Sequence, residues 1–253
     1  MGKLIHLDVG CANAAIIAGN NTFLVDCYDI GRYSQHLPSS KRFRGVFITH
    51  PHRDHYDGLR YLKDNGYAID FLIYSPYERR HGDNSLSIEE WNEFNSLKDH
   101  FVAKGTELRA PYKQESWKEA WWKAGDVEFW ILGPQKAIAT SPTREVHDAC
   151  LVVYAKMGSR RCLFTGDASD TNLQDVATVK NNCGDILCAS HHASINGADL
   201  TFIKSADAKY TVISTATGVH DNVPHPTALR RYADNTSEKV YRTDQDGTIT
   251  FTF

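Results

Sequence analysis

Three histidines and an aspartate stand close together in the segment THPHRDHYDG, as His50, His52, Asp54 and His55. Imidazole nitrogen and carboxylate oxygen are donors that zinc and similar divalent ions prefer in proteins. The segment follows a β-branched and aromatic run at residues 45–49, which predicts a short buried strand that ends at His50. A tight loop after a strand can aim alternate side chains in different directions. We therefore predict that His50 and His52 bind one ion, while Asp54 and His55 bind its neighbour.

The spacing His-x-His-x-Asp-His resembles the signature loop of the metallo-β-lactamase superfamily. The run LFTGD, which ends at Asp167, resembles the strand whose terminal aspartate bridges two metal ions in that superfamily. The run SHHAS at residues 190–194 stands at the end of another predicted strand, where a further ligand is expected. The resemblance covers nearly the whole chain except about residues 64–120. It implies an α+β fold, the αββα sandwich, in which two mixed β-sheets are flanked by helices.

Within this superfamily the chain is most similar to the hydrolase domain of the ComEC-type competence proteins and its free-standing relatives. Shared features are an opening strand ending in LDVG, a double-histidine loop, a Pro-His-Pro segment and a threonine-acidic-glycine segment near the C-terminus. The chain departs from the relatives at four places. It has Asn13 where they usually have aspartate, Cys27-Tyr28 in place of a small turn, and Ala193 in place of glycine. It also has His147 where they often have asparagine, which favours a complete first metal site.

The resemblance extends the ligand set beyond the histidine-rich loop. In many members a histidine at the position of His147 completes the first metal site, and the neighbouring Asp148 is the alternative here. One of His191 and His192 is expected to be a ligand. We favour His192 because it directly precedes the small Ala193, as the ligand does in related nucleases, and His191 would then orient it or contact substrate. The predicted metal ligands are His50, His52, Asp54, His55, His147, Asp167 and His192.

Two further residues have predicted roles beside these ligands. Asp26 closes an apolar strand, and in the superfamily such an aspartate supports the metal-binding loop from behind. His225 lies between two prolines, which restrict its backbone, so we predict that it contacts a phosphate or the leaving group, with a purely structural role as the alternative. Asp54 is predicted to hold the attacking water and accept its proton. The remaining histidines belong to no cluster in the sequence and are interpreted as ordinary: His6, His36, His81, His100 and His220.

The predicted cofactors are two divalent metal ions. Histidine-rich ligation favours zinc, while the carboxylates leave manganese and iron open. Two cations roughly 3.5 Å apart lower the pKa of a bridging water toward neutrality, and the resulting hydroxide attacks carbon or phosphorus. The resemblance implies a phosphodiesterase or nuclease-like enzyme. The alternatives are an ester, thioester or amide hydrolase acting on a small molecule, and a metal-binding module without catalysis.

The composition limits the partners and the compartment. The chain has 253 residues and a formal net charge of −3, which argues against a long nucleic-acid footprint but is compatible with a nucleotide-type or other small substrate. The six cysteines form no C-x-x-C pair and are interpreted as free thiols in a reducing compartment. No apolar run reaches the roughly 20 residues of a membrane-spanning helix. We therefore expect a cytoplasmic protein without a membrane partner, and the oligomeric state is left open.

Predicted strands and helices must bring these segments together. The first half is expected to contain strands at residues 3–9, 22–26 and 45–49, a helix from Asp57, and a helix at 87–100 capped by Ser85 or Ser87. Three tryptophans at helical spacing predict a helix over residues 114–123 that packs in the core, with the lining of a substrate cleft as the alternative.

The second half is expected to alternate strands and helices. The predicted strands lie at residues 127–132, 150–156, 161–165, 185–189 and 210–214, and the predicted helices near 170–180, 198–206 and 226–234. Residues 239–242 and 248–253 are predicted to form a hairpin that turns at Asp246-Gly247. The simplest organisation is a single domain over residues 1–253 with a variable insertion at about 64–145.

Overall fold

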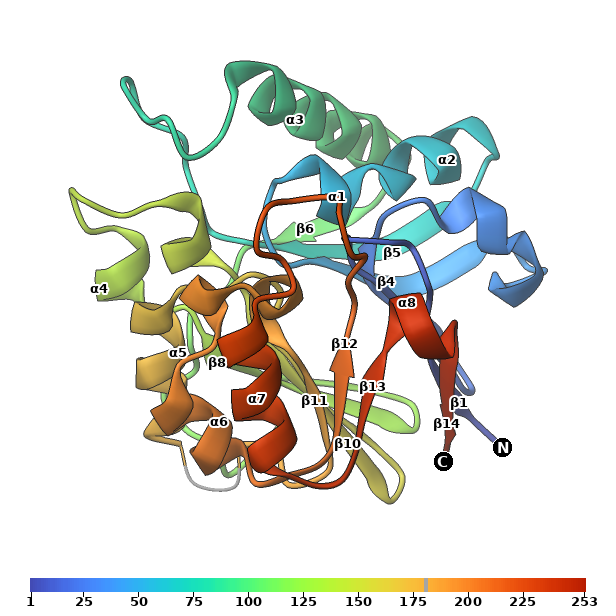
Figure 1. The fold of residues 1–253 in the computed structure, drawn as a ribbon. Helices are drawn as coiled ribbons and strands as arrows, with labels where there is room; N and C mark the ends of the chain where they lie inside the picture. Colours follow the sequence, from blue (N-terminus) through green and yellow to red (C-terminus); the bar gives the residue numbers. More distant parts are fainter. Residues whose placement is uncertain (180–181) are drawn as a thin grey trace.

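The computed structural model describes residues 1–179 and 182–253. Two seven-stranded sheets pack face to face, and helices cover their outer faces (Figure 1). The predicted αββα architecture, with two mixed sheets flanked by helices, is therefore confirmed. Among the described residues, no helix combines the length and the apolar character that a membrane span requires.

The first sheet joins an antiparallel half to a parallel half. Its strands, in spatial order, are β14 (Ile249–Thr252), β1 (Lys3–His6), β2 (Ala14–Ala18), β3 (Thr22–Cys27), β4 (Arg42–Ile48), β5 (Ala68–Tyr74) and β6 (Glu107–Arg109). Pairing is antiparallel from β14 to β3 and parallel from β3 to β6. The carboxyl ends of β3 and β4 therefore lie side by side at one edge.

The second sheet repeats this plan. Its strands, in spatial order, are β13 (Thr236–Arg242), β12 (Ala208–Ile213), β11 (Ile186–Cys188), β10 (Arg160–Phe164), β9 (Val152–Met157), β8 (Val127–Gly133) and β7 (Trp122–Ala124). Pairing is parallel from β13 to β10 and antiparallel from β10 to β7. The loops after the parallel strands β10 and β11 begin at a common edge, which is where ligands bind in many open α/β sheets.

Helices complete the outer layers. The α-helices are α1 (Arg53–Tyr56), α2 (Gly58–Asp64), α3 (Ile88–Ala103), α4 (Lys136–Ala139), α5 (Asp170–Ala177), α6 (Leu200–Ala206), α7 (Pro226–Asp234) and α8 (Thr243–Asp246). Short 3-10 segments are η1 (Ile30–His36), η2 (Val146–Ala149), η3 (Ser190–Ala193) and η4 (Ile195–Gly197). As predicted, a serine caps α3, because the Ser87 hydroxyl accepts a hydrogen bond from the backbone N–H of Glu90.

An aromatic cluster fills the space between the sheets. The rings of Phe23 and Phe129 lie 5.0 Å apart, those of Phe47 and Phe129 4.7 Å apart, and Trp122 packs beside all three. Each large apolar side chain buried in this way stabilises the fold by about 1.5–3 kcal/mol relative to exposure. Separate apolar layers join the outer faces of the sheets to their helices, through residues such as Phe94 of α3 and Phe202 of α6.

The predicted helix over residues 114–123 is wrong. This segment is irregular up to Trp121, and Trp122 begins strand β7. The side-chain oxygen of Gln114 accepts a hydrogen bond from the backbone N–H of Ile131, and the backbone N–H of Gln114 donates to the Ile131 carbonyl, so the segment runs beside β8 instead of forming a helix. The spacing of the tryptophans therefore does not reflect a helix. Trp122 is placed by tertiary packing, because it fills the core between the sheets.

The predicted C-terminal hairpin is also wrong. Strand β13 pairs in parallel with β12 in the second sheet, while β14 pairs with β1 in the first sheet. The Asp246 carboxylate accepts a hydrogen bond from the backbone of Arg242, which closes helix α8 at the point where a hairpin turn was predicted. Strands β13 and β14 therefore lie at the edges of different sheets, and the chain crosses from the second sheet to the first between them.

Two smaller differences concern the first 145 residues. The predicted strand at residues 3–9 ends at His6, and the sequence analysis missed β2, although the turn at residues 19–21 does lie between β2 and β3. Residues 64–145 contribute strands to both sheets, namely β5 and β6 to the first and β7 and β8 to the second.

Candidate metal centre

The histidine-rich loop is tied to the end of the neighbouring strand by Asp26. This carboxylate, at the end of β3, accepts hydrogen bonds from the backbone N–H and the hydroxyl of Thr49, each at 2.8 Å. It also accepts from Nδ1 of His55 at 2.8 Å. The Nε2 atom of His55 is therefore left to face the centre, since a hydrogen bond to one ring nitrogen fixes the role of the other.

His50, His52 and His147 form what we call the first ligand group. Nε2 of His50 lies 3.0 Å from Nδ1 of His52. Nε2 of His52 lies 2.9 Å from the Ser85 carbonyl, and donation there leaves Nδ1 of His52 as an acceptor directed at the group. Three imidazoles thus offer nitrogen donors to one point, and the group contains no carboxylate.

His147 reaches this group from the segment η2. Its ring lies 5.2 Å from that of His50 and 5.1 Å from that of His52. Burial, opposed by the Asp167 carboxylate and aided by the surrounding histidines, lowers the pKa of His147 to about 3, so the ring is neutral at pH 7. Its neighbour Asp148 is directed elsewhere, because its carboxylate accepts hydrogen bonds from Ser169 and from the backbone of Glu145. Of the two alternatives, the structure brings His147 to the group.

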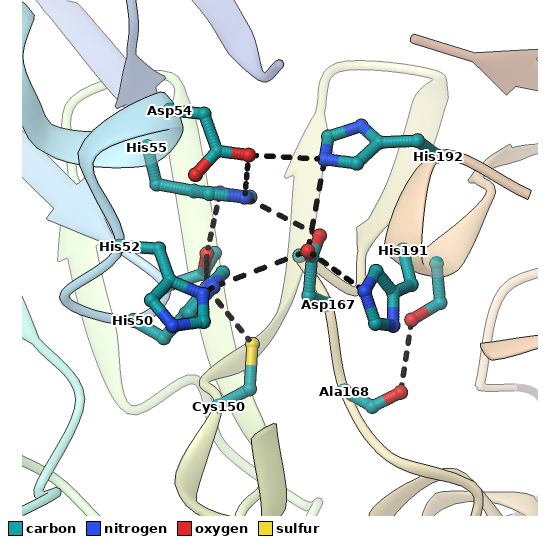
Figure 2. A network of polar contacts seen from close by, with 12 residues as sticks. His50, His52, Asp54, His55, Cys150, Asp167, Ala168, His191 and His192 are labelled. Carbon is teal, nitrogen blue, oxygen red and sulfur yellow. Dashed lines mark hydrogen bonds and ion pairs between the residues drawn. The ribbon is translucent and has the colours of Figure 1, made fainter. Parts of the chain in front are cut away.

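Asp54, His55, Asp167 and His192 form the second ligand group. Oδ2 of Asp54 lies 3.6 Å from Nε2 of His55 and 3.3 Å from Nε2 of His192. Oδ1 of Asp167 lies 3.3 Å from Nε2 of His55, and its Oδ2 lies 3.6 Å from Nε2 of His192. Figure 2 shows these side chains converging from both sheets.

Asp167 also connects the two groups. Its Oδ2 lies 4.0 Å from Nε2 of His50 in the first group, so one carboxylate faces both. The preceding Gly166 brings it there, with a φ of +49° and no room for a side chain. An added Cβ at Gly166 would lie 2.4 Å from the Thr49 hydroxyl, so β10 can approach the histidine-rich loop this closely only with glycine.

The double-histidine loop has a strained backbone. His191, His192 and Ala193 have φ values of 51°, 52° and 62°, a left-handed conformation that non-glycine residues seldom adopt. Nδ1 of His192 lies 2.9 Å from the Ser214 carbonyl, which directs Nε2 into the second ligand group. His191 lies nearer the surface, with Nε2 3.7 Å from Asp167, and forms an overlapping set with Asp167 and His147.

Several buried polar atoms at the centre have no hydrogen-bond partner among residues 1–179 and 182–253. They are Nε2 of His55, His147 and His192, and Oδ1 of Asp167. A buried polar atom without a partner costs about 1–3 kcal/mol, so four such atoms within the two ligand groups indicate that the centre binds an occupant. Imidazole lone pairs and carboxylate oxygens at these separations suit the coordination of divalent cations. The described residues therefore fit two such ions, with Asp167 between them.

The charges of the two groups shift their pKa values in opposite directions. Burial, together with His55 and His52, holds the pKa of His50 well below its usual value. Burial alone would also lower the pKa of His55, but the carboxylates of Asp167 and Asp26 raise it well above that value. Burial would raise the pKa of Asp54, yet His55 and His192 lower it to about 2, so this carboxylate is ionised at neutral pH.

A cleft of about 500 Å³ opens over the centre. It is lined by ligands of both groups and, further out, by Cys11, Tyr28, Arg53, Val219, His220 and Val223. The sequence analysis missed His220, and the only signal for it was a position five residues before His225 in the same loop. A second cavity of about 490 Å³ shares His147 with the cleft and is lined in part by Arg80, Asp83 and Arg144.

His225 is placed differently from the predicted ligands. Its Nδ1 accepts a hydrogen bond from the N–H of Thr227 at 3.1 Å, which caps helix α7. Its backbone N–H donates to the Ala193 carbonyl at 2.9 Å, so it supports the double-histidine loop. Contact of its ring with a substrate stays a prediction.

Comparison with known proteins gave structural matches only. A scan against models of protein families and a search of curated proteins found no match. Among solved structures, the metallo-β-lactamase fold protein YhfI from Bacillus subtilis matches with a TM-score of 0.60 and 16% identity, over 99% of this chain and 100% of that one. The chain has the metallo-β-lactamase fold.

Other proteins with the metallo-β-lactamase fold match less of their own length or less closely. CmlA, a diiron β-hydroxylase from Streptomyces venezuelae, has a TM-score of 0.62 and 13% identity over 99% of this chain and 54% of that one. A diphosphatase from the PhnP family has a TM-score of 0.52 and 14% identity over 100% and 98%. Identities this low establish the metallo-β-lactamase fold alone, since one fold hosts many functions.

Proposed function

We propose that the protein is a hydrolase with two divalent metal ions that cleaves a small phosphodiester of nucleotide type. The observation that carries this proposal is the pair of ligand groups that Asp167 connects, with members of both lining one cleft. Structural metal sites are usually closed and bind a single ion, whereas this pair opens to a cleft of about 500 Å³. An open centre of this kind favours catalysis over a binding module.

The bound ions and Asp54 would have different roles in the reaction. Two divalent ions held there would lower the pKa of an attacking water and stabilise negative charge on the substrate oxygen. Asp54 belongs to the second group, and its side chain is 35% exposed, so the carboxylate also faces the cleft. It is ionised at neutral pH and is therefore placed to accept the proton of that water.

Three features support a small phosphodiester. Arg53 lines the cleft beside the ligands, where its guanidinium can face a phosphate, while the cavity that shares His147 balances Arg80 and Arg144 against Asp83 and Glu145. The formal net charge of −3 weighs against tight binding along a nucleic acid, which needs many cationic contacts. The resemblance to ComEC-type hydrolases, and the fold shared with a PhnP-family diphosphatase, are consistent with chemistry at phosphorus.

The test is hydrolysis of bis-p-nitrophenyl phosphate by the metal-free protein after addition of Zn²⁺, Mn²⁺ or Fe²⁺. We expect metal-dependent turnover in the wild type and in the control His36→Ala, which changes a histidine outside the centre. His52→Ala and Asp167→Ala should abolish it. Two bound ions per chain without turnover on this substrate or on a panel of nucleotide diesters would contradict the proposal.

An apolar wall of the cleft favours a second candidate. Val219, Val223 and Tyr28 line the cleft together with the charged ligands, which suits an uncharged carboxylic ester, thioester or amide. Turnover of p-nitrophenyl acetate or an acyl thioester that depends on Asp167, together with inactivity on every phosphodiester, would decide for this alternative.

A further inference from the structure

A second set of potential metal ligands lies away from the candidate metal centre, between the two sheets. His6 ends strand β1 of the first sheet, while Cys162 in β10 and Cys188 in β11 belong to the second. The two sulfur atoms are 3.7 Å apart, and Nδ1 of His6 lies 3.8 Å from the sulfur of Cys188. All three donor atoms lie within 4.8 Å of one another.

The spacing of these donors fits coordination of one ion better than a disulfide. A disulfide bond joins its sulfur atoms at about 2.05 Å, far shorter than the distance here. Two sulfur atoms bound tetrahedrally to one ion at about 2.3 Å lie about 3.8 Å apart, and a sulfur and an imidazole nitrogen about 3.6 Å apart. The observed distances of 3.7 Å between the sulfur atoms and 3.8 Å between sulfur and nitrogen are close to these expected separations.

The cluster lies in largely buried surroundings, and its three side chains contact one another. His6 is 2% exposed, its ring lies 6.0 Å from that of Phe164, and its Nε2 has no hydrogen-bond partner in the described part of the chain. A small cavity of about 20 Å³, lined in part by His6 and Cys188, adjoins the cluster. That volume holds one water molecule, which can serve as a fourth ligand.

We propose that His6, Cys162 and Cys188 form a third metal site, which binds a thiophilic ion, Zn²⁺ or Cu⁺, and cross-links the two sheets. Soft thiolate donors select these ions, and two thiolates with a neutral imidazole balance the charge of Zn²⁺ in the apolar core.

This inference does not depend on the proposed function. The third site shares no ligand with the two groups around Asp167, and none of those ligands is a cysteine. A probe that reports only on thiolate ligation can therefore test the third site alone.

Cobalt(II) is such a probe, because thiolate ligands give it a charge-transfer absorption in the near ultraviolet. Cobalt(II) is titrated into the full-length, metal-free, reduced protein. We expect three bound ions per chain, with an absorption that saturates at one thiolate-bound ion. Cys162→Ser and Cys188→Ser should each lose this absorption and one equivalent of metal while the other two ions still bind. The control Cys11→Ser, which changes a thiol at the cleft, should keep the absorption.

Two further measurements decide the outcome without relying on the variants. Displacement of cobalt(II) by one equivalent of Zn²⁺ or of Cu⁺ identifies the preferred ion, and binding should raise the Tm of the wild type by several degrees. Absence of the charge-transfer absorption in the wild type would overturn the proposal, even if both cysteine variants fail to fold. A disulfide between Cys162 and Cys188 would also overturn it, if mass spectrometry without reductant shows the loss of two hydrogens at these residues and cobalt(II) does not bind the reduced pair.

Discussion

The two ligand groups of the candidate metal centre lie side by side but differ in charge. The first group consists of three imidazoles, and burial keeps the pKa values of His50 and His147 low. The second contains the carboxylates of Asp54 and Asp167, which raise the pKa values of its histidines above their usual range. One fold can thus place a neutral site beside an anionic one. We expect the two sites to differ in the ions they prefer and in their response to mutation.

The largest effect should come from Asp167, which belongs to the second group and faces the first. Asp167→Ala removes the carboxylate that faces His50, His55 and His192, so both ions should be lost. We expect kcat/KM to fall by about 10³-fold or more. Metal analysis after gel filtration, together with steady-state kinetics, measures both effects. Retention of a full equivalent of metal beyond the third site would mean that the two groups are more independent than their geometry indicates.

Metal preference should separate the two groups. Carboxylates suit Mn²⁺, whereas imidazoles suit Zn²⁺, so protein loaded with Zn²⁺ until the third site and the first group are filled should take up Mn²⁺ in the second group. The electron paramagnetic resonance signal of bound Mn²⁺ should then be lost in His192→Ala and kept in His52→Ala. The reverse result would contradict the assignment of charge to the two groups.

A smaller effect is expected from Asp26, which hydrogen-bonds one ligand of the second group, His55, and no ligand of the first. Asp26→Asn would weaken the hydrogen bond that orients His55 without removing a ligand. Loss of such a supporting contact lowers metal affinity by about 10–100-fold. Titration with a competing chelator should show weaker binding at one ion of the two. The control is Asp29→Asn, whose carboxylate pairs only with Arg32 near the surface, and it should leave both affinities unchanged.

The smallest effect should follow a change in the backbone of the double-histidine loop. Ala193→Gly relieves the strain of a left-handed alanine, which costs about 1–2 kcal/mol, but it increases the entropy of the unfolded chain and removes a buried methyl group. These contributions nearly cancel, so the free energy of unfolding should change by less than about 1 kcal/mol. A thermal melt and a metal titration check this. A large loss of metal would show that the alanine methyl group itself positions His192.

The local sequence was enough to predict the histidine-rich part of the site, and the resemblance of its motifs was enough to predict the fold. Spacing alone marks His50, His52, Asp54 and His55, because a short loop must hold all four near one another whatever the rest of the chain does. The run that ends at Asp167 was recognisable only through resemblance, since nothing in the sequence itself states that β10 ends beside β4. The choice of His147 over Asp148 needed the hydrogen bonds that occupy the aspartate.

Other features depend on contacts between distant parts of the chain. The predicted helix at residues 114–123 failed because helical spacing of tryptophans does not distinguish a helix from side chains drawn into one core. The C-terminal hairpin failed because a strand pairs with whichever sheet edge is open. Similarly, His6 gave no signal as a ligand, because its cysteine neighbours lie more than 150 residues away in the sequence and meet it only when the sheets pack.

The pairing of β14 with β1 has a consequence for how the protein is made. These strands lie at opposite ends of the described chain, where Gly2 and Phe253 exchange backbone hydrogen bonds. The ribosome therefore delivers β1, and the loop that carries His50 to His55, long before the strand that closes their sheet. Until β14 emerges, one edge of the nascent sheet offers unpaired backbone groups to neighbouring chains. A ribosome that stalls before residue 249 would release a chain that holds its metal-binding histidines but is prone to aggregate through β1.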